Sequence, residues 1–306
     1  MTITVLVPHD DGVTALSAVP GVRAVRYDVE DLAEGVPGAA AEAEVLIPGA
    51  KPAALLPLLG AMPRLRLIQL LSAGAEDWAD EVPDGVLLST CRGAHGGSTA
   101  EWVVAVLLSA YRGLPAFAEA QRERVWRPGT TGTLQGSRVL VVGAGDVGNQ
   151  VRRRLLPFDA WVTMVGFTPR DGVHGAEELP RLLPGTDAVV LVTPLTSRTR
   201  GMVDAEFLAA LPDGALLVNA SRGPVVDTGA LLAELTSGRL SAALDVTDPE
   251  PLPPGHPLWT APNVVITPHV AGAVRGARRR SYRVAAAEIE RYVRGELPDN
   301  LVQGEY

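Results

Sequence analysis

A chain of 306 residues has room for two domains of about 150 residues each. With 47% hydrophobic and 20% charged residues, it has the composition of a folded globular protein, which excludes a disordered, collagen-like or coiled-coil chain. The formal net charge of −8 argues against nucleic acid and anionic membranes as main partners, because both require a basic surface.

Three features bear on where the protein works. The single cysteine, Cys91, has no partner for an internal disulfide, which favours a reducing compartment. The chain starts with a strand-like run, MTITVLVP, and carries no basic segment before it, so no secretory signal is expected. No run reaches about 18 consecutive apolar residues, so no membrane span is expected. We therefore expect a cytoplasmic protein.

The first third of the chain alternates short apolar runs with helical stretches such as 52–59. Strands are predicted at 3–7, 23–27, 44–47, 65–71 and 86–89. These runs are apolar throughout rather than at every second residue, which indicates a parallel sheet buried on both faces. A long helix is predicted from Ser98 to about Ala120, with Ser98 or Thr99 as its cap and Glu101 in its first turn. The stretch 127–137 is predicted to be a connection.

A second series of strands and helices follows. Strands are predicted at 138–142, 161–166, 188–193, 215–219, 242–246 and 264–267, each separated from the next by a loop or a helix. A final helix is expected from 273 to about 294, with Gly295 as its C-cap. The pattern predicts two doubly wound α/β domains with a ligand site between them.

A phosphate-binding turn is indicated at VLVVGAGDVG. Gly143, Gly145 and Gly148 form a G-x-G-x-x-G pattern directly after a strand and before a helix predicted at 147–156. In this context the three glycines allow a tight turn, close approach of a pyrophosphate, and packing of the helix on the strand. The helix N-terminus supplies free N–H groups for the phosphate charge. The motif predicts a dinucleotide site.

The end of the next strand suggests which dinucleotide binds. An NAD site usually has an acidic residue there, about 20 residues past the turn, but this strand ends in Gly-Phe-Thr-Pro-Arg without a carboxylate. Thr168 and Arg170 are suited to hold a 2′-phosphate, so NADP is favoured over NAD. Asp171 lies past the turn and is not given the ribose role. Alternatively, Arg170 is a solvated loop cation and the site accepts either cofactor.

Three later segments place polar residues at the ends of predicted strands, where open α/β sheets bind ligands. They carry Arg222 in VNASRG, Asp245 and Glu250 in ALDVTDPEP, and His269 in VVITPHVAG. A cation at such an edge can hold a carboxylate and polarise a carbonyl, and an acid can protonate an oxygen on which negative charge develops. Arg222 suits the first task as a bidentate donor. His269 suits the second, with Glu250 as the partner that stabilises its imidazolium form.

The sequence resembles a known family, the D-isomer-specific 2-hydroxyacid dehydrogenases, and among them most closely the glyoxylate/hydroxypyruvate reductases. The resemblance covers almost the whole chain and lies in LSAGAEDW (71–78), STAEW (98–102), VVGAGDVG (141–148), VNASRGPVVD (218–227), ALDVTDPEPLP (243–253) and TPHVAG (267–272). It implies a Rossmann cofactor domain at 99–275, a smaller flavodoxin-like substrate domain formed by 1–98 and 276–306, and a homodimer.

The resemblance also implies site residues. It gives Arg222, Glu250 and His269 as catalytic, and makes Arg222 and His269 substrate contacts together with the backbone N–H groups of Ser72, Ala73 and Gly74. It places Asp245 at the nicotinamide end. The expected cofactor-binding residues are Gly143, Gly145, Asp146, Val147, Gly148, Thr168, Arg170, Thr193, Pro194, Ala220, Asp245 and Gly272. No metal is expected.

Some residues have a plainer interpretation. Trp126 resembles a position where some family members present an aromatic side chain to the substrate pocket, across a dimer, but taken alone it indicates core or interface packing. The run 278–280 favours a solvated face or an interface over an anion site. Cys91 is expected to be an inert thiol, and His9, His95, His174 and His256 to be structural.

The sequence leaves other functions open. A formate- or phosphite-oxidising dehydrogenase uses the same scaffold, although formate dehydrogenases of this family pair their histidine with Gln, whereas Glu250 stands here. A nucleotide-sensing protein that resembles the corepressors built on this fold can retain the same Arg, Glu and His. A methyltransferase also uses a glycine turn, but it gives no reason for these three residues together. The leading prediction is reduction of a small 2-keto acid such as glyoxylate or hydroxypyruvate to its D-2-hydroxy acid.

Overall fold

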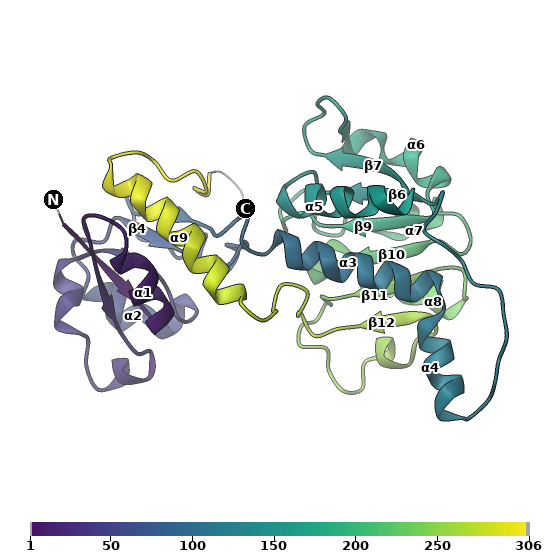
Figure 1. The fold of residues 1–306 in the computed structure, drawn as a ribbon, viewed down its shortest axis with the longest axis horizontal. Coiled ribbons are helices and arrows are strands. Elements are labelled where there is room, and N and C mark those ends of the chain that lie inside the picture. Colours follow the sequence, from purple (N-terminus) through teal and green to yellow (C-terminus); the bar gives the residue numbers. More distant parts are fainter. Residues whose placement is uncertain (1, 304–306) are drawn as a thin grey trace. The chain divides into compact units, whose positions relative to one another are not determined.

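A computed structural model describes residues 2–303 of the chain (Figure 1). The chain divides into two compact units, Met1–His95 with Arg275–Tyr306, and Gly96–Val274. The unit boundaries lie within three residues of those expected from the sequence. We describe each unit by itself.

The first unit contains a parallel sheet of five strands within the described residues, in the order β2-β1-β3-β4-β5. This order is that of flavodoxin-like folds. The strands are β1 (Ile3–Val7), β2 (Val22–Arg26), β3 (Ala43–Leu46), β4 (Leu67–Gln69) and β5 (Leu87–Ser89). The helices are α1 (Asp10–Ser17), α2 (Pro52–Gly60) and α9 (Ala277–Val293), with 3-10 turns at Glu30–Ala33 and Gly38–Glu42.

Both faces of this sheet are covered, because its strands send successive apolar side chains to opposite sides. On β1, Leu6 faces the cluster that includes α2, whereas Val5 and Val7 face the cluster that includes α1 and α9. All five residues of β1 are buried. The expectation of a sheet covered on both faces is confirmed.

The second unit is built on a larger parallel sheet, ordered β12-β11-β10-β9-β6-β7-β8 in the part of the chain that the structure describes. Its strands are β6 (Arg138–Val142), β7 (Trp161–Gly166), β8 (His174–Gly175), β9 (Ala188–Leu191), β10 (Leu216–Asn219), β11 (Ser241–Leu244) and β12 (Val264–Ile266). Its helices are α3 (Gly96–Tyr111), α4 (Leu114–Arg122), α5 (Asp146–Leu155), α6 (Leu179–Leu182), α7 (Ala205–Ala209) and α8 (Thr228–Thr236). With β6 as the first strand, the sheet has the Rossmann order with one added strand, so the predicted fold class is confirmed.

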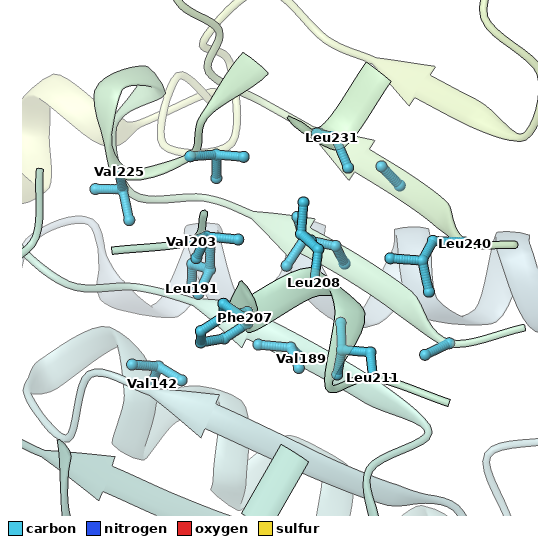
Figure 2. Packing of buried hydrophobic residues seen from close by; sticks show 14 of the residues in the cluster. Val142, Val189, Leu191, Val203, Phe207, Leu208, Leu211, Val225, Leu231 and Leu240 are labelled. Carbon is cyan, nitrogen blue, oxygen red and sulfur yellow. The ribbon is translucent and has the colours of Figure 1, made fainter. Parts of the chain in front are cut away.

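Helices cover this sheet on both sides. The α3 and α5 helices pack on one face, and α6, α7 and α8 pack on the other (Figure 1). Figure 2 shows the second side, where Phe207 and Leu208 of α7 lie against Val189 and Leu191 of β9. Because neighbouring strands are parallel, their carboxyl ends lie along one edge of the sheet.

The structure corrects some predicted helix boundaries. The single helix predicted for 98–120 is two helices, because Gly113 adopts a left-handed conformation and ends the first. The predicted cap is also wrong, since α3 begins at Gly96 and both Ser98 and Thr99 are buried inside its first turn. The last helix starts later than expected, after Gly276, and the two-residue strand β8 was not predicted.

None of the described helices is by itself long and apolar enough to span a membrane. Within residues 2–303, α3 and α4 taken together are the one pair that meets that length and composition, and they are bent by 63° at the break between them.

Candidate active site

The glycine turn follows β6 and opens α5, as the sequence predicts. Gly143 has a φ of +120°, and a Cβ there would lie 2.5 Å from the carbonyl oxygen of Val192. A Cβ on Gly148 would lie 1.9 Å from the carbonyl oxygen of Gly143. A Cβ on Gly145, in contrast, would meet nothing within 4 Å. Gly143 and Gly148 are therefore required by packing within the protein, whereas the space in front of Gly145 is open to a ligand.

A cavity of about 340 Å³ lies beside this turn. It is bounded by the ends of β6, β7 and β9, and its lining includes Gly143, Gly145, Thr168, Arg170, Thr193 and Pro194. The Thr193 hydroxyl is buried there and makes no hydrogen bond within the described residues. Buried polar groups normally have a partner, so this hydroxyl calls for a polar group supplied by a ligand. The open turn, the helix N-terminus and this hydroxyl together fit a dinucleotide.

Arg170 lies at the adenosine end expected for such a ligand. One of its guanidinium nitrogens, Nη2, donates a hydrogen bond to the carbonyl oxygen of Ala144 at 2.7 Å. Its backbone is held by two hydrogen bonds with Val173, which close a small turn after β7. The guanidinium is thereby fixed at the cavity wall, close to the glycine turn.

The other residues predicted to bind the cofactor do not line this cavity. Asp146 packs its carboxylate against Gly96, the first residue of α3, while Val147 and Ala220 pack against the core cluster beneath α3 and α5. Gly148 packs on Gly143, and Gly272 follows the His269 loop. Several lining residues were not predicted from the sequence: Val142, Ala144, Val165, Gly166, Phe167, Ala176, Val192 and Met202. Most of them lie at the end of a strand, directly after one or beside the glycines of the turn, and this position was the only available signal; Met202 has no such signal.

The loops with the predicted catalytic residues leave the sheet side by side. Asn219 at the end of β10 is in register with Leu244 at the end of β11, which is in register with Ile266 at the end of β12. Arg222 and His269 come three residues after the first and last of these. The loops also pack closely, since a Cβ on Gly223 would lie 1.9 Å from the carbonyl oxygen of Thr247.

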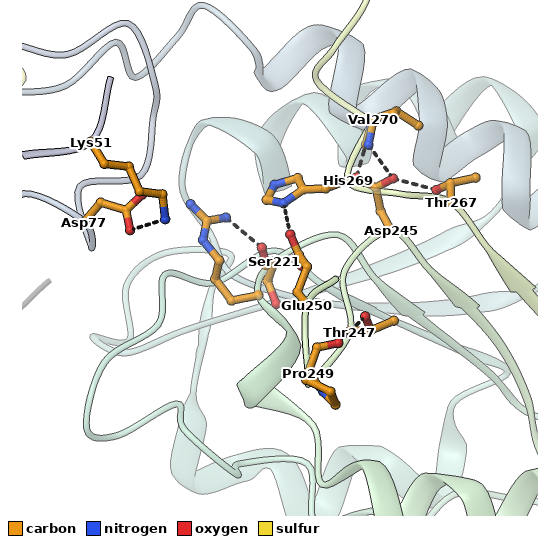
Figure 3. A network of polar contacts seen from close by, with 12 residues as sticks. Lys51, Asp77, Ser221, Asp245, Thr247, Pro249, Glu250, Thr267, His269 and Val270 are labelled. Atoms are coloured by element: carbon orange, nitrogen blue, oxygen red, sulfur yellow. Dashed lines mark hydrogen bonds and ion pairs between the residues drawn. The ribbon is translucent and has the colours of Figure 1, made fainter. Parts of the chain in front are cut away.

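The imidazole and the carboxylate meet as predicted. Nδ1 of His269 lies 2.7 Å from Oε1 of Glu250 (Figure 3). Their side chains are 48% and 41% exposed, so the pair is open to a ligand. Nε2 of His269 makes no hydrogen bond within the described residues and is the ring nitrogen left for a substrate. His269 has a φ of +54°, a conformation that few residues other than glycine adopt.

Asp245 holds the loop that carries this histidine. Its buried carboxylate accepts hydrogen bonds from the Thr267 hydroxyl at 2.5 Å and from the backbone N–H of Val270 at 2.9 Å (Figure 3). It also accepts one from the backbone N–H of Ala271 at 2.9 Å. The backbone N–H of His269 donates to the Asp245 carbonyl oxygen at 2.7 Å. These four bonds fix the backbone on both sides of His269.

Arg222 extends from a loop that is held in a similar way. The Asn219 side chain accepts hydrogen bonds from the backbone N–H and the hydroxyl of Ser221, and donates one to the carbonyl oxygen of Arg222. One guanidinium nitrogen of Arg222 donates to the Ser221 carbonyl oxygen at 2.7 Å. The guanidinium is thus carried by an ordered backbone at the carboxyl edge of the sheet.

The predicted substrate loop lies in the first unit, after β4. The Ser72 hydroxyl donates to the carbonyl oxygen of Gly74 at 2.6 Å, and the Cys91 N–H donates to the Ser72 carbonyl oxygen at 2.7 Å. Nε2 of His95 lies 2.9 Å from the carbonyl oxygen of Leu71. The loop is therefore shaped by its own hydrogen bonds at the carboxyl edge of the smaller sheet.

Comparison with known proteins identifies the family. The family model described as D-isomer specific 2-hydroxyacid dehydrogenase, NAD binding domain, matches residues 104–271 of this chain. The chain is 33% identical to the glyoxylate reductase of Thermofilum pendens, over 81% of this chain and 78% of that protein. It is 35% identical to the glyoxylate reductase/hydroxypyruvate reductase of Mus musculus, over 78% of this chain and 77% of that protein. The chain belongs to the D-isomer specific 2-hydroxyacid dehydrogenase family.

A solved structure of the same family supports this identification across the whole chain. The D-isomer specific 2-hydroxyacid dehydrogenase of Xanthobacter autotrophicus Py2, in complex with NADPH and MES, superposes with a TM-score of 0.84 at 34% identity. The match covers 99% of this chain and 98% of that one. The chain is accordingly an NAD(P)-dependent 2-hydroxyacid dehydrogenase.

The structure also describes the surroundings of the residues for which the sequence indicated a plainer role than catalysis. Trp126 is 94% exposed, which excludes the core packing considered for it. Burial raises the pKa of the Cys91 thiol to about 12, and the thiol donates to the Ser281 carbonyl oxygen. Within the 278–280 run, Arg278 pairs with Asp11 and Arg280 donates to the Ala94 carbonyl oxygen. The four other histidines are each hydrogen-bonded within the chain: His9, His95, His174 and His256.

Proposed function

We propose that the protein reduces glyoxylate, hydroxypyruvate or a similarly small 2-keto acid to the D-2-hydroxy acid, with NADPH favoured over NADH. The observation that carries the proposal is the His269–Glu250 pair, 2.7 Å apart on loops that leave neighbouring strands of the cofactor-binding sheet. In the proposed reaction a bound dihydronicotinamide supplies a hydride to the keto carbon. The residues of the chain supply the charge, the proton and the orientation.

Arg222 has the chemistry to bind the keto acid. Its planar guanidinium can hold the carboxylate through two hydrogen bonds and polarise the carbonyl oxygen, on which negative charge develops. The backbone N–H groups of the Ser72–Gly74 loop are proposed to hold the same carboxylate from the smaller unit. Asp245 is proposed to stand at the nicotinamide end while its carboxylate keeps the 267–271 loop in place.

His269 is the proposed general acid. Because Glu250 occupies the Nδ1 side of the ring, the proton for the alkoxide is held at Nε2. The carboxylate stabilises the imidazolium form that carries this proton. In oxidation of a hydroxy acid, the same nitrogen accepts the proton. Formate oxidation needs no such proton transfer, so the charged partner favours hydroxyacid chemistry over a formate-type reaction.

The cofactor preference is proposed from the end of β7. Arg170 and Thr168 line the cavity beside the glycine turn, and no carboxylate is among the lining residues. A cation at this place attracts a 2′-phosphate, whereas a carboxylate would repel it. The complex of the Xanthobacter relative with NADPH is consistent with this preference.

We also propose a homodimer that works in the cytoplasm. Support for the dimer comes from the segment that follows α3, where Leu114, Phe117, Val125 and Trp126 are large apolar side chains exposed on the isolated chain. A cavity of about 760 Å³ lies along the same segment. Exposed apolar surface of this kind is typical of a protein interface. The lone, buried Cys91 supports a reducing compartment.

The proposal is tested by following the absorbance of NADPH and NADH with glyoxylate, hydroxypyruvate, pyruvate and phenylpyruvate. We expect oxidation of NADPH with the two smaller or hydroxylated acids, at a higher kcat/KM than with NADH. Tight binding of the cofactor without turnover on any of the acids would favour a nucleotide-sensing, corepressor-like protein instead.

A further inference from the structure

One wall of the cavity beside the glycine turn is formed by the loop between β9 and α7, residues 192–204. Thr193, Pro194 and Met202 of this loop are among the lining residues. The start of the loop packs on the turn itself, because a Cβ on Gly143 would lie 3.0 Å from the backbone nitrogen of Thr193. The shape of this wall therefore depends on what holds the loop.

Thr199 holds the loop from within, although it is not itself a lining residue of the cavity. Its side chain is fully buried. Its hydroxyl donates a hydrogen bond to the carbonyl oxygen of Pro194 at 2.7 Å and accepts one from the backbone N–H of Thr196, also at 2.7 Å. Its carbonyl oxygen accepts a hydrogen bond from the backbone N–H of Met202 at 3.1 Å. Thr199 is thus bonded to two residues of the cavity wall, Pro194 and Met202.

The second half of the loop is also anchored to the loop that carries Arg222. The backbone N–H of Gly201 donates to the carbonyl oxygen of Pro224 at 2.8 Å, and that of Val203 donates to the carbonyl oxygen of Val225 at 3.0 Å. The Thr199 hydroxyl extends this support to Pro194, five residues earlier in the chain.

A polar group on the supported segment calls for a ligand. The Thr193 hydroxyl is buried and makes no hydrogen bond within the described residues. Thr193 directly precedes Pro194, so the bond from Thr199 fixes the backbone next to this hydroxyl. Thr168 and Arg170 line the same cavity from the segment after β7, where the adenosine end of a dinucleotide is expected. The segment 193–196 is therefore placed to contact the adenosine half.

We propose that Thr199 is a positioning residue for the cofactor, whose hydroxyl holds the segment 193–196 in the conformation that accepts the adenosine half of a nicotinamide dinucleotide. Without the hydroxyl the loop populates other conformations, and the affinity falls with the fraction that remains competent to bind. The inference rests on the part of the proposed function that assigns this cavity to the dinucleotide. It does not depend on which keto acid is reduced.

The test measures binding of 2′,5′-ADP and 5′-ADP, the adenosine halves of NADPH and NADH, by titration calorimetry. Thr199→Val keeps the shape of the side chain and removes the hydroxyl. We expect it to bind both probes about fivefold to tenfold more weakly than the wild type, the size set by one hydrogen bond. Thr199→Ser keeps the hydroxyl and should restore the wild-type affinity.

A matched control is available in the same unit. Thr186 is also buried, its hydroxyl donates to the carbonyl oxygen of Leu182 at 3.0 Å, and it does not line the cavity. Thr186→Val makes the same replacement as Thr199→Val and should leave the affinity for both probes unchanged. Urea unfolding of each variant checks that the fold is kept.

A second readout needs no bound ligand and no turnover. The backbone N–H of Thr196 loses its acceptor in Thr199→Val, so its hydrogen exchange should be faster than in the wild type and in Thr186→Val. In the wild type, 2′,5′-ADP should slow the same exchange, because the ligand favours the loop conformation that Thr199 holds. This last comparison requires no variant to fold.

The outcomes separate the inference from the proposed function. Wild-type affinity for both probes in a folded Thr199→Val, an equal loss in Thr186→Val, or Thr196 exchange that ignores 2′,5′-ADP would overturn the role of Thr199 and leave the proposed function intact. A wild type that binds neither probe would overturn both.

Discussion

The glycines of the phosphate-binding turn differ in what an added Cβ atom would meet at each position. Gly148 is confined by the Gly143 carbonyl oxygen, whereas nothing in the protein confines Gly145. We predict that Gly148→Ala destabilises the fold by about 1–3 kcal/mol, because the added methyl overlaps backbone. Gly145→Ala should unfold like the wild type in urea but bind NADPH at least about tenfold more weakly, since its methyl enters the ligand's space. Equal NADPH affinity in Gly145→Ala and the wild type would show that no diphosphate approaches there.

A second prediction at this scale concerns Asp245. Its carboxylate accepts three hydrogen bonds from the 267–271 loop, and an amide in its place can accept them at one oxygen only. We predict that Asp245→Asn lowers both kcat and the free energy of unfolding, the latter by about 1–3 kcal/mol. Thr267→Val removes one donor and should have a smaller effect on both. Wild-type kcat in Asp245→Asn would mean that the loop holds His269 without this carboxylate.

At the scale of elements, Arg239 joins two helices of the cofactor-binding unit. Its guanidinium donates to the carbonyl oxygens of Leu208 in α7 and of Leu211 in the turn after it, and to the Glu234 carboxylate of α8 at 2.6 Å. The Arg239 and Glu234 side chains are only 23% and 21% exposed. Arg239 thereby adds a charged donor to carbonyl oxygens at and just after the C-terminus of α7 and connects this segment to α8.

We predict that Arg239→Met lowers the free energy of unfolding by about 2 kcal/mol at pH 7. The hydrogen bond from Arg239 lowers the pKa of the Glu234 carboxyl, so its contribution is present above the unfolded-state pKa and is lost as the pH falls through the folded-state value. Glu234→Gln should therefore be less stable than the wild type at pH 7, and the difference should shrink as the pH falls below the ordinary pKa of a glutamate, about 4.3. Urea unfolding across this range checks the prediction, and a constant difference at all pH values would contradict it.

The agreement between predicted and observed elements has a physical reason. Strands such as β1 and β6 are buried on both faces, and their continuous apolar runs left little choice of boundary. The predicted element boundaries are wrong where a single residue sets the backbone conformation or where an element is very short. Gly113 breaks a helix that its apolar pattern would continue, and β8 has only two residues, which is too short to give a pattern. Gly96 starts α3 where a serine cap was expected.

At the scale of the whole molecule, the types and the order of the candidate site residues could be predicted from the sequence, but their contacts could not. Glycine spacing and the residues after each strand were enough to predict His269, Glu250 and the turn. The bonds from Asp245 to its loop join segments 22 to 26 residues apart, through side-chain conformations that no spacing encodes. The lining residues Phe167 and Met202 are apolar and carry no chemical signal in the sequence.

The assembly can be tested through Trp126. Burying its exposed ring in a partner would explain why a large apolar side chain is 94% exposed on the isolated chain. We predict a dimer by sedimentation velocity, and a weaker one in Trp126→Ala. The exposed Trp161 of the same unit provides a comparison variant, Trp161→Ala. A wild-type monomer at all protein concentrations would exclude the homodimer.

The central claim is that His269 donates the proton during reduction of a keto acid. It is tested most directly by measuring, in the wild type and in His269→Gln, both the NADPH affinity and the rate of NADPH oxidation with glyoxylate. We predict an unchanged affinity and a kcat reduced by about 10²- to 10⁴-fold, the range that general acid catalysis supplies. A His269→Gln enzyme that turns over at close to the wild-type rate would contradict the mechanism proposed for this site.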